Sequence, residues 1–263
     1  IQKLTAYAHR YNSKVYIALN TILFDDELDE AKDLIVKLWN VGADALIIQD
    51  MGLMEMDLPP IPLFASTQTD NRNPDHVRFL EKVGFERVIL ARELSLAEIR
   101  AIRKVTTVEL EAFVHGSLCV SYSGRCYLSA AMGGRSANRG ACGQPCRLPW
   151  TLTSADGSII EKNRHLLSLK DMNRFDHLAD LAQAGITSFK IEGRLKDISY
   201  LKNITAFYRK GLDALLEETT GVVKASSGTT TFFFTPAPEK TFNRGETDYF
   251  LTGEKGEIHS LDT

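Results

Sequence analysis

The four cysteines of this chain all lie in one glycine-rich segment that runs from Glu109 to Trp150. Glycine lets a backbone turn tightly enough to bring separated sulfurs to one centre, and thiolates are ligands for zinc and for iron–sulfur clusters. The spacing C-x6-C-x15-C-x3-C therefore predicts a single four-cysteine metal site, with an iron–sulfur cluster favoured. The predicted ligands are Cys119, Cys126, Cys142 and Cys146.

Zinc is the main alternative occupant, because four cysteines also satisfy a tetrahedral zinc site. Zinc ribbons and fingers use paired short C-x2–4-C motifs, whereas only Cys142 and Cys146 are that close here. Buried free thiols are typical of scattered cysteines rather than of a set confined to one segment. Disulfides are rare in intracellular proteins, and the rest of the chain has the pattern of an intracellular α/β protein.

The same segment carries positive charge that could serve RNA. Arginine donates bidentate hydrogen bonds to phosphate, although arginines here could equally balance the charge of the cluster thiolates. The chain as a whole has a net charge of -3, so any RNA contact must come from a local basic patch rather than from overall charge. The arginines of the segment are Arg125, Arg135, Arg139 and Arg147.

The composition is that of an ordinary globular protein. Of the 263 residues, 44% are hydrophobic and 25% are charged, and no apolar run is long enough for a membrane helix. The chain starts with no secretory signal, so we expect no membrane association and a cytoplasmic location. It opens in an amphipathic helix without an initiating Met and closes within a β-like run, so we expect the natural protein to extend beyond both ends.

Short apolar runs alternate with amphipathic helices through most of the chain. This alternation predicts βα units and a parallel sheet. No G-x-G-x-x-G or Walker A pattern follows any of the runs, which argues against nucleotide binding of those kinds. The predicted strands are Lys14–Asn20, Ala45–Asp50, Leu63–Ser66, Arg87–Ala91, Glu109–Val114 and Ser188–Glu192, and the helices between and after them are Leu28–Val41, Pro74–Val83, Ser95–Lys104, Phe175–Ala184 and Tyr200–Glu218.

The number of strands favours an α/β fold of the TIM-like (β/α)8 barrel type that lacks its first strands here. A doubly wound open sheet is the alternative. We predict the barrel over residues 1–218, with the cysteine segment at 115–150, and the truncated start of a small β-rich C-terminal domain over residues 219–263. In either fold, the chemistry is expected at the carboxyl ends of the strands.

Polar side chains near those strand ends are the candidates for catalysis and binding. Strict alternation along the fifth strand would put Glu111 and His115 on one face. A buried carboxylate needs a cationic partner, and Lys190 of the sixth strand is a candidate for that role. Glu192 and Arg194 follow Lys190 at the end of the same strand.

Three motifs resemble one known family, the collagenase-like proteins called peptidase family U. The first is Glu111-x-Phe113-x-x-Gly116-Ser117-Leu118-Cys119 followed by Gly124-x-Cys126-x-Leu128-Ser129, and the others are NRGACGQPCR at Asn138–Arg147 and FKIEGR at Phe189–Arg194. The resemblance covers most of the chain. It implies a barrel with a [4Fe-4S] cluster held by the four cysteines, and within the family it is nearest to RNA-modifying enzymes.

The resemblance further implies hydroxylation of a cytidine in large-subunit ribosomal RNA, with prephenate or a related carboxylate metabolite as co-substrate. The redox partner of the cluster is unknown. On this hypothesis the catalytic residues are Glu111, His115, Lys190 and Glu192, and the substrate-binding residues are Arg125, Arg135, Arg139, Arg147 and Arg194. The alternatives are hydroxylation of a tRNA uridine, a cysteine peptidase, and a non-catalytic scaffold stabilised by its metal.

Overall fold

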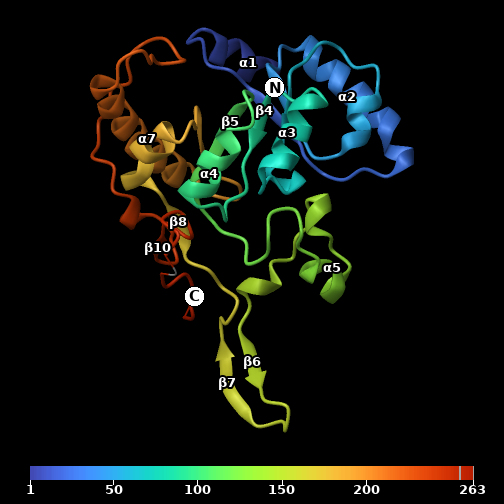
Figure 1. The fold of residues 1–263 in the computed structure, drawn as a ribbon, viewed down its shortest axis with the longest axis vertical. Helices are drawn as coiled ribbons and strands as arrows, with labels where there is room; N and C mark the ends of the chain where they lie inside the picture. Colours follow the sequence, from blue (N-terminus) through green and yellow to red (C-terminus); the bar gives the residue numbers. More distant parts are fainter. Residues whose placement is uncertain (255, 263) are drawn as a thin grey trace.

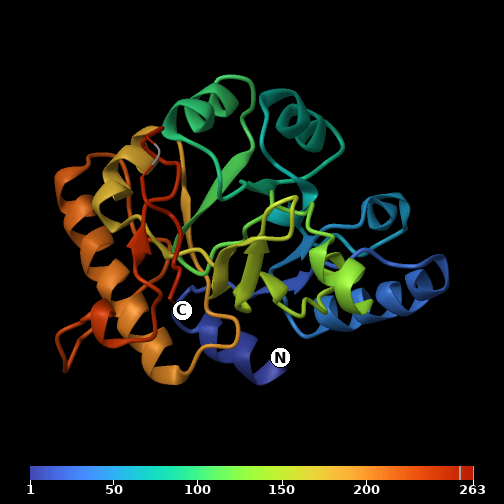
Figure 2. The ribbon, with the colours of Figure 1, turned by 90° about the horizontal axis from the view of Figure 1, so that it is seen from below.

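The computed structural model describes residues 1–254 and 256–262. A curved, mostly parallel sheet forms its centre, and helices cover the outside of the curve (Figures 1 and 2). In the order of the chain the helices are α1 Gln2–His9, α2 Leu28–Asn40, α3 Pro74–Lys82, α4 Leu96–Arg103, α5 Leu128–Gly133, α6 Leu178–Gln183 and α7 Ile198–Glu218. No helix within these ranges is both long and apolar enough to cross a bilayer.

Six strands pair in parallel in the order β1, β2, β3, β4, β5 and β9. Each strand is a short β-branched or apolar run, and the chain returns to the same end of the sheet before the next strand begins. The six strands predicted from the sequence are confirmed to within a few residues. Their bounds are β1 Tyr16–Leu19, β2 Ala45–Ile48, β3 Leu63–Ala65, β4 Arg87–Ile89, β5 Glu109–Gly116 and β9 Ser188–Ile191. Among the described residues no pairing joins β9 to β1, so the sheet is open and no closed barrel is present.

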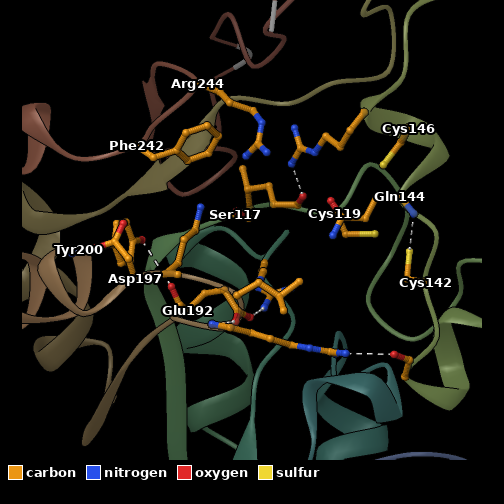
Figure 3. A pocket seen from close by; sticks show the side chains of 17 residues that line it. Ser117, Cys119, Cys142, Gln144, Cys146, Glu192, Asp197, Tyr200, Phe242 and Arg244 are labelled. Atoms are coloured by element: carbon orange, nitrogen blue, oxygen red, sulfur yellow. Dashed lines mark hydrogen bonds and ion pairs between the residues drawn. The ribbon is translucent and has the colours of Figure 1, made fainter.

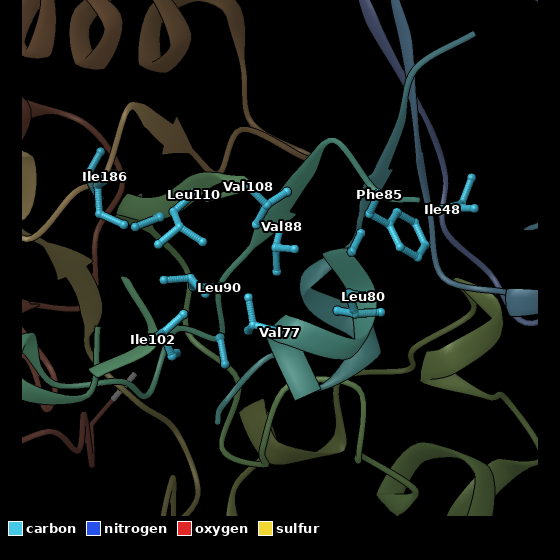
Figure 4. Packing of buried hydrophobic residues seen from close by; sticks show 14 of the residues in the cluster. Ile48, Val77, Leu80, Phe85, Val88, Leu90, Ile102, Val108, Leu110 and Ile186 are labelled. Atoms are coloured by element: carbon cyan, nitrogen blue, oxygen red, sulfur yellow. The ribbon is translucent and has the colours of Figure 1, made fainter. Parts of the chain in front are cut away.

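The two faces of the sheet carry different apolar clusters. On the outer face, Val88, Leu90 and Leu110 of the strand region pack against Val77 and Leu80 of α3 (Figure 4). On the inner face a smaller cluster gathers aromatic and aliphatic side chains, Ile47, Phe64, Ile89 and Phe113 among them. Burial on both faces explains why the strands read as continuous apolar runs in the sequence.

Helix α4 shows how closely local sequence sets an element's boundary. Ser95 accepts a hydrogen bond from the backbone N–H of Glu98 at 3.3 Å, and Glu98 accepts one from the backbone N–H of Ser95 at 2.8 Å. This reciprocal pair satisfies two N–H groups that a helix start leaves free. Ser95 and Glu98 thus form a capping box at the start of α4.

The chain leaves the parallel pattern after β5. A two-stranded hairpin, β6 Trp150–Thr153 and β7 Ile159–Arg164, projects away from the sheet (Figure 1). The short strand β8 Asp171–Asn173 then pairs antiparallel with the end of β5, and β10 Glu246–Thr247 joins β8. The three-residue β8 was not among the strands predicted from the sequence.

The region after Thr219 differs from the expected β-rich segment. The aromatic run at 230–235 has no regular secondary structure, and the one strand described beyond Thr219 is β10, which belongs to the main sheet. The strands predicted for this run are wrong, because its phenylalanines are exposed or half-buried and have no neighbouring strand to pair with. The domain boundary near residue 219 stays a prediction.

Candidate functional site

A cavity of about 590 Å³ opens at the carboxyl ends of β4, β5 and β9. Ser117, Leu118 and Cys119 follow β5 directly, and Arg92 and Glu192 follow β4 and β9. Residues far along the chain close the opposite side, as Figure 3 shows for Phe242 and Arg244. The position agrees with the rule that parallel α/β sheets bind ligands at this edge.

Three of the four cysteines, Cys119, Cys142 and Cys146, line this cavity, and Figure 3 shows them on one side of it. All four cysteines are free thiols, so no disulfide pairs them. Burial raises the pKa of the Cys119 thiol to about 11, and the nearby thiols of Cys126 and Cys146 add to that rise. The pKa of Cys146 is raised in the same way by burial and by Cys142 and Cys126. Cys146 therefore lies within electrostatic reach of the other three thiols.

Four thiols in one segment are a donor set that suits either a [4Fe-4S] cluster or a zinc ion. Within residues 1–254 and 256–262, no three His, Cys, Asp or Glu side chains converge closely enough to hold one metal ion. Arg92 and Arg147 supply positive charge beside Cys119 and Cys146.

The cysteine segment is fastened over the carboxyl ends of the first strands by polar contacts. Ser123 donates from its backbone N–H and its hydroxyl to the carboxylate of Glu93, at 3.0 and 2.9 Å. The backbone N–H of Ile22 donates to the carbonyl of Asn138 at 3.1 Å. These contacts place the thiols at the strand edge although the segment has little secondary structure of its own.

Gly124 is the tightest point of this attachment. It has a φ of +76°, and a Cβ there would lie 2.0 Å from the carbonyl oxygen of Gln68. We expect Gly124→Ala to detach the segment from the β3 loop and to destabilise the protein by about 2 kcal/mol or more. Thermal unfolding and bound iron are the measurements, and both should fall.

Gly133→Ala is the matched control for that substitution. Gly133 lies in α5 of the same segment, and a Cβ there would meet nothing within 4 Å. Alanine is the better helix former, so this variant should keep its metal and be as stable as the parent or slightly more so. Equal behaviour of the two variants would contradict the role given to Gly124.

The five predicted substrate arginines divide into two groups. Arg125 pairs with Asp70 at 2.7 Å and Arg139 with Glu27 at 2.7 Å, so both fasten the cysteine segment. Arg135 donates to the carbonyl of Ala141 at 3.0 Å within the segment. Of the five, only Arg147 and Arg194 line the cavity.

Of the predicted catalytic residues, only Glu192 lines the cavity. One of its carboxylate oxygens accepts from Arg92 Nη2 at 2.8 Å, and the other accepts from the backbone N–H of Arg194 at 3.0 Å. Both oxygens are therefore engaged in holding neighbouring groups. This arrangement makes Glu192 the residue that positions Arg92 over the ring of Phe113, 3.9 Å from its centroid.

Glu111 and Lys190 meet as predicted, but below the cavity rather than in its wall. Glu111 is 4% exposed and accepts from Lys190 Nζ at 3.0 Å, from Arg87 Nη1 at 3.1 Å and from Ser188 Oγ at 2.8 Å. Burial by itself would raise the pKa of Glu111, but Lys190, Ser188 and Arg87 hold it below its ordinary value. The carboxylate is thus a buried anion shared by two cations.

His115 does not share the face of Glu111, and the expected alternation is wrong at its end. The pairing of β5 with β9 shifts register between Phe113 and His115, and such a bulge changes the face to which the following residue points. His115 lies against α7, where its Nδ1 is 3.3 Å from Tyr208 Oη. Burial lowers the pKa of His115 to about 4, so the ring is neutral at pH 7.

Several residues that line the cavity were not predicted as site residues. Ser117 and Gln144 stand inside the quoted family motifs, but most of the others come from the loop after β9 or from the segment before β10. For Lys196 and Asp197 the only signal in the sequence is the charge that follows FKIEGR, which a loop of any function could show. The residues of this set are Ser117, Gln144, Leu195, Lys196, Asp197, Tyr200, Phe242 and Arg244.

Comparisons with known proteins agree on one family. The model of a family described as "Peptidase family U32" matches residues 1–261 of this chain. The chain is 54% identical over 263 residues to the "23S rRNA 5-hydroxycytidine C2501 synthase" of Escherichia coli (strain K12), covering 100% of this chain and 40% of that protein.

Two further relatives differ in what their names say. The "tRNA hydroxylation protein P1" of Bacillus subtilis (strain 168) is 34% identical over 217 residues, which cover 79% of this chain and 51% of that protein. A "Collagenase" of Porphyromonas gingivalis (strain ATCC BAA-308 / W83) is 31% identical over 216 residues, covering 76% and 52%. The chain thus spans about half the length of these relatives or less.

Proposed function

Because this chain belongs to peptidase family U32, we propose that it carries the catalytic centre of an RNA-modifying hydroxylase that forms 5-hydroxycytidine in large-subunit ribosomal RNA. The observation that carries the proposal is the gathering of four free thiols beside a cationic cavity at the carboxyl edge of the sheet. The relative named for this reaction is 54% identical over the whole chain, and ribosomal RNA as substrate implies a cytoplasmic protein.

The cofactor in this proposal is a [4Fe-4S] cluster held by Cys119, Cys126, Cys142 and Cys146, with zinc as the alternative. A bound cluster would supply electron transfer. The protein's own contribution is a pair of arginines beside the thiols and a segment fastened to the sheet by Glu93, which keep the cysteines in place. For the whole protein we also propose a (β/α)8 barrel, supported by six consecutive parallel strands.

The cavity suits an RNA base that has left its stack. Enzymes that modify a base in structured nucleic acid take it out of the stack and hold it in a pocket. The wall of this cavity includes the aromatic ring of Phe242, which is 55% exposed and can stack on a base. Arg194 lies at the mouth, exposed, where it can meet phosphate. The proposed co-substrate is prephenate or a related carboxylate, which matches the positive charge of the cavity.

A peptidase is the weaker alternative despite the collagenase relative. A cysteine nucleophile must be a thiolate and needs a base beside it. The pKa of Cys119 is raised to about 11 by burial, and the nearest histidine in sequence, His115, is bonded to Tyr208 instead. No observation on the cavity favours peptide cleavage over RNA hydroxylation.

Mass spectrometry of nucleosides tests the proposed reaction. Cells that lack the full-length gene should lose 5-hydroxycytidine from large-subunit ribosomal RNA, and the intact gene should restore it. Measurement of 5-hydroxyuridine in tRNA from the same cells tests the alternative substrate. If the ribosomal modification persists in the deletion strain, the proposal is wrong, and loss from tRNA alone would assign the protein to the tRNA reaction.

A further inference from the structure

Three cations gather in one corner of the cavity: Arg147, Lys196 and Arg244. They come from three separate segments, one in the cysteine segment, one after β9 and one before β10. Burial lowers the pKa of Lys196. The charge of Asp171 raises it, and the charges of Arg244 and Arg147 lower it further. Lys196 and Arg244 also lie over the same ring, at 4.3 and 4.7 Å from the centroid of Phe242.

Of these three cations, only Arg244 is paired with a carboxylate among the described residues. Asp171 is 4% exposed and lies 3.4 Å from Arg244 Nη1. Arg147 donates to the carbonyls of Leu118 and Leu169, at 2.7 and 2.5 Å, and to a serine hydroxyl, none of which carries charge. Arg147 and Lys196 thus have no carboxylate paired with them among the described residues, and Glu192, which also attracts Lys196, is paired with Arg92.

Lys196 is the cation with no anionic partner. Its Nζ makes no hydrogen bond or ion pair with any residue in the described ranges, and it lies 4.3 Å from the ring centroid of Phe242 and 5.2 Å from that of Tyr200. The side chain is half-buried. An ammonium group that lies over two aromatic rings and faces a cavity is in position to donate hydrogen bonds to a ligand.

The other two carboxylates of the cavity wall are already engaged. Asp197 accepts from the backbone N–H of Tyr200 at 2.8 Å and caps the start of α7. Glu192 holds Arg92 and the backbone of Arg194. Neither is paired with the three-cation corner, and leaving that much half-buried positive charge without a counter-ion is costly.

We propose that Arg147, Lys196 and Arg244 form a subsite for a ligand group with two negative charges on oxygen atoms. The inference rests on the proposed function, because it names where the anionic part of that reaction's reactants binds. Guanidinium forks hold pairs of oxygen atoms and the ammonium adds a point charge. Two sources share this chemistry: a small free dianion, such as a dicarboxylate or a phosphate, and successive phosphates of the RNA.

The most direct variant is Lys196→Gln, since Lys196 makes no hydrogen bond that the fold would lose. Calorimetric titration of the purified protein with malonate and with inorganic phosphate should show affinity at least about tenfold weaker in this variant, because one charged donor is gone. Lys196→Arg should keep most of the affinity. Lys104→Gln, at an exposed position at the end of α4, should bind both anions like the parent.

A fluorescent fragment of the substrate RNA distinguishes the two sources. If Lys196→Gln weakens malonate and phosphate but leaves RNA affinity unchanged, the subsite takes a small dianion. If RNA affinity also falls and the slope of log affinity against log salt decreases by about one, the subsite takes RNA phosphate.

Either result with RNA supports the subsite. Failure of the parent protein to bind malonate and phosphate would overturn it, as would equal binding by the parent and Lys196→Gln. These titrations need no hydroxylation, so the subsite can fail while the proposed reaction stands, and the reverse is also true.

Discussion

Replacing Cys142 with alanine is expected to abolish both the cluster and the hydroxylation. Cys142 is exposed and its sulfur accepts one hydrogen bond, from the backbone N–H of Gln144 at 3.3 Å. Its loss therefore removes a ligand without opening a cavity in the core. The measurements are the visible absorption of the protein purified without oxygen and the 5-hydroxycytidine content of ribosomal RNA in complemented cells.

Met132→Ala is the matched control for the loss of an exposed, sulfur-containing side chain from the same segment. Met132 is 52% exposed, and this variant should keep both the cluster absorption and the modification. The unfolding temperature of each variant shows whether a loss of cluster or modification comes from unfolding, since neither substitution touches the core. An active Cys142→Ala protein without iron would remove the cluster from the mechanism.

Glu111→Gln is expected to destabilise the protein by about 3–5 kcal/mol, because removal of one partner from a buried ion pair leaves the other charge uncompensated. Lys190 would lose its only ion pair among the described residues, and Arg87 would keep only Glu109. Chemical denaturation gives the free energy of unfolding. Glu109→Gln is the control, because Glu109 also binds Arg87 but its side chain is 56% exposed. Exposed ion pairs contribute about 1 kcal/mol or less to stability.

The effect of Glu111 should depend on pH in a defined direction. Its pKa in the folded protein lies below the ordinary value of 4.5, so the unfolded chain binds the proton more readily than the folded one. The stabilisation is complete above about pH 4.5 and is lost as the pH falls through the lower folded pKa. The parent and Glu111→Gln should therefore converge in stability as the pH falls below the folded pKa of Glu111.

A double variant tests whether the lost stability comes from the unpaired cation. Adding Lys190→Met to Glu111→Gln removes the charge that was left alone, so part of the stability should return. If the double variant were no more stable than Glu111→Gln alone, the pair would not be the source. Hydroxylation should follow the fraction of folded protein in all three variants, because Glu111 lies below the cavity wall.

The parallel strands were predictable because the central ones are buried: β2 is buried throughout and β5 everywhere except at Glu109. A run such as Ala45–Ile48 carries no polar residue, and that pattern is hard to mistake when helices with a clear apolar stripe flank it. The antiparallel strand β8 was not predictable, since its residues, Asp171–Asn173, have no strand pattern. It forms only because the end of β5 offers a free edge.

The residues of the site also differ in how far the sequence predicts them. The cysteines and Glu192 were predictable from motif and strand end, whereas Lys196, Phe242 and Arg244 reach the cavity through loops whose course local sequence does not determine. The bulge in β5 that removes His115 from the face of Glu111 depends on pairing with β9. Arg125 and Arg139 were assigned to phosphate because their carboxylate partners, Asp70 and Glu27, lie far away in the sequence.

Iron and acid-labile sulfide in protein purified without oxygen measure the central claim most directly. The account predicts about four irons and four sulfides per chain, with a broad thiolate-to-iron absorption band. One zinc per chain and no sulfide would contradict it. The cysteine segment would then be a structural zinc site, and the hydroxylation would have to depend on other groups of the cavity.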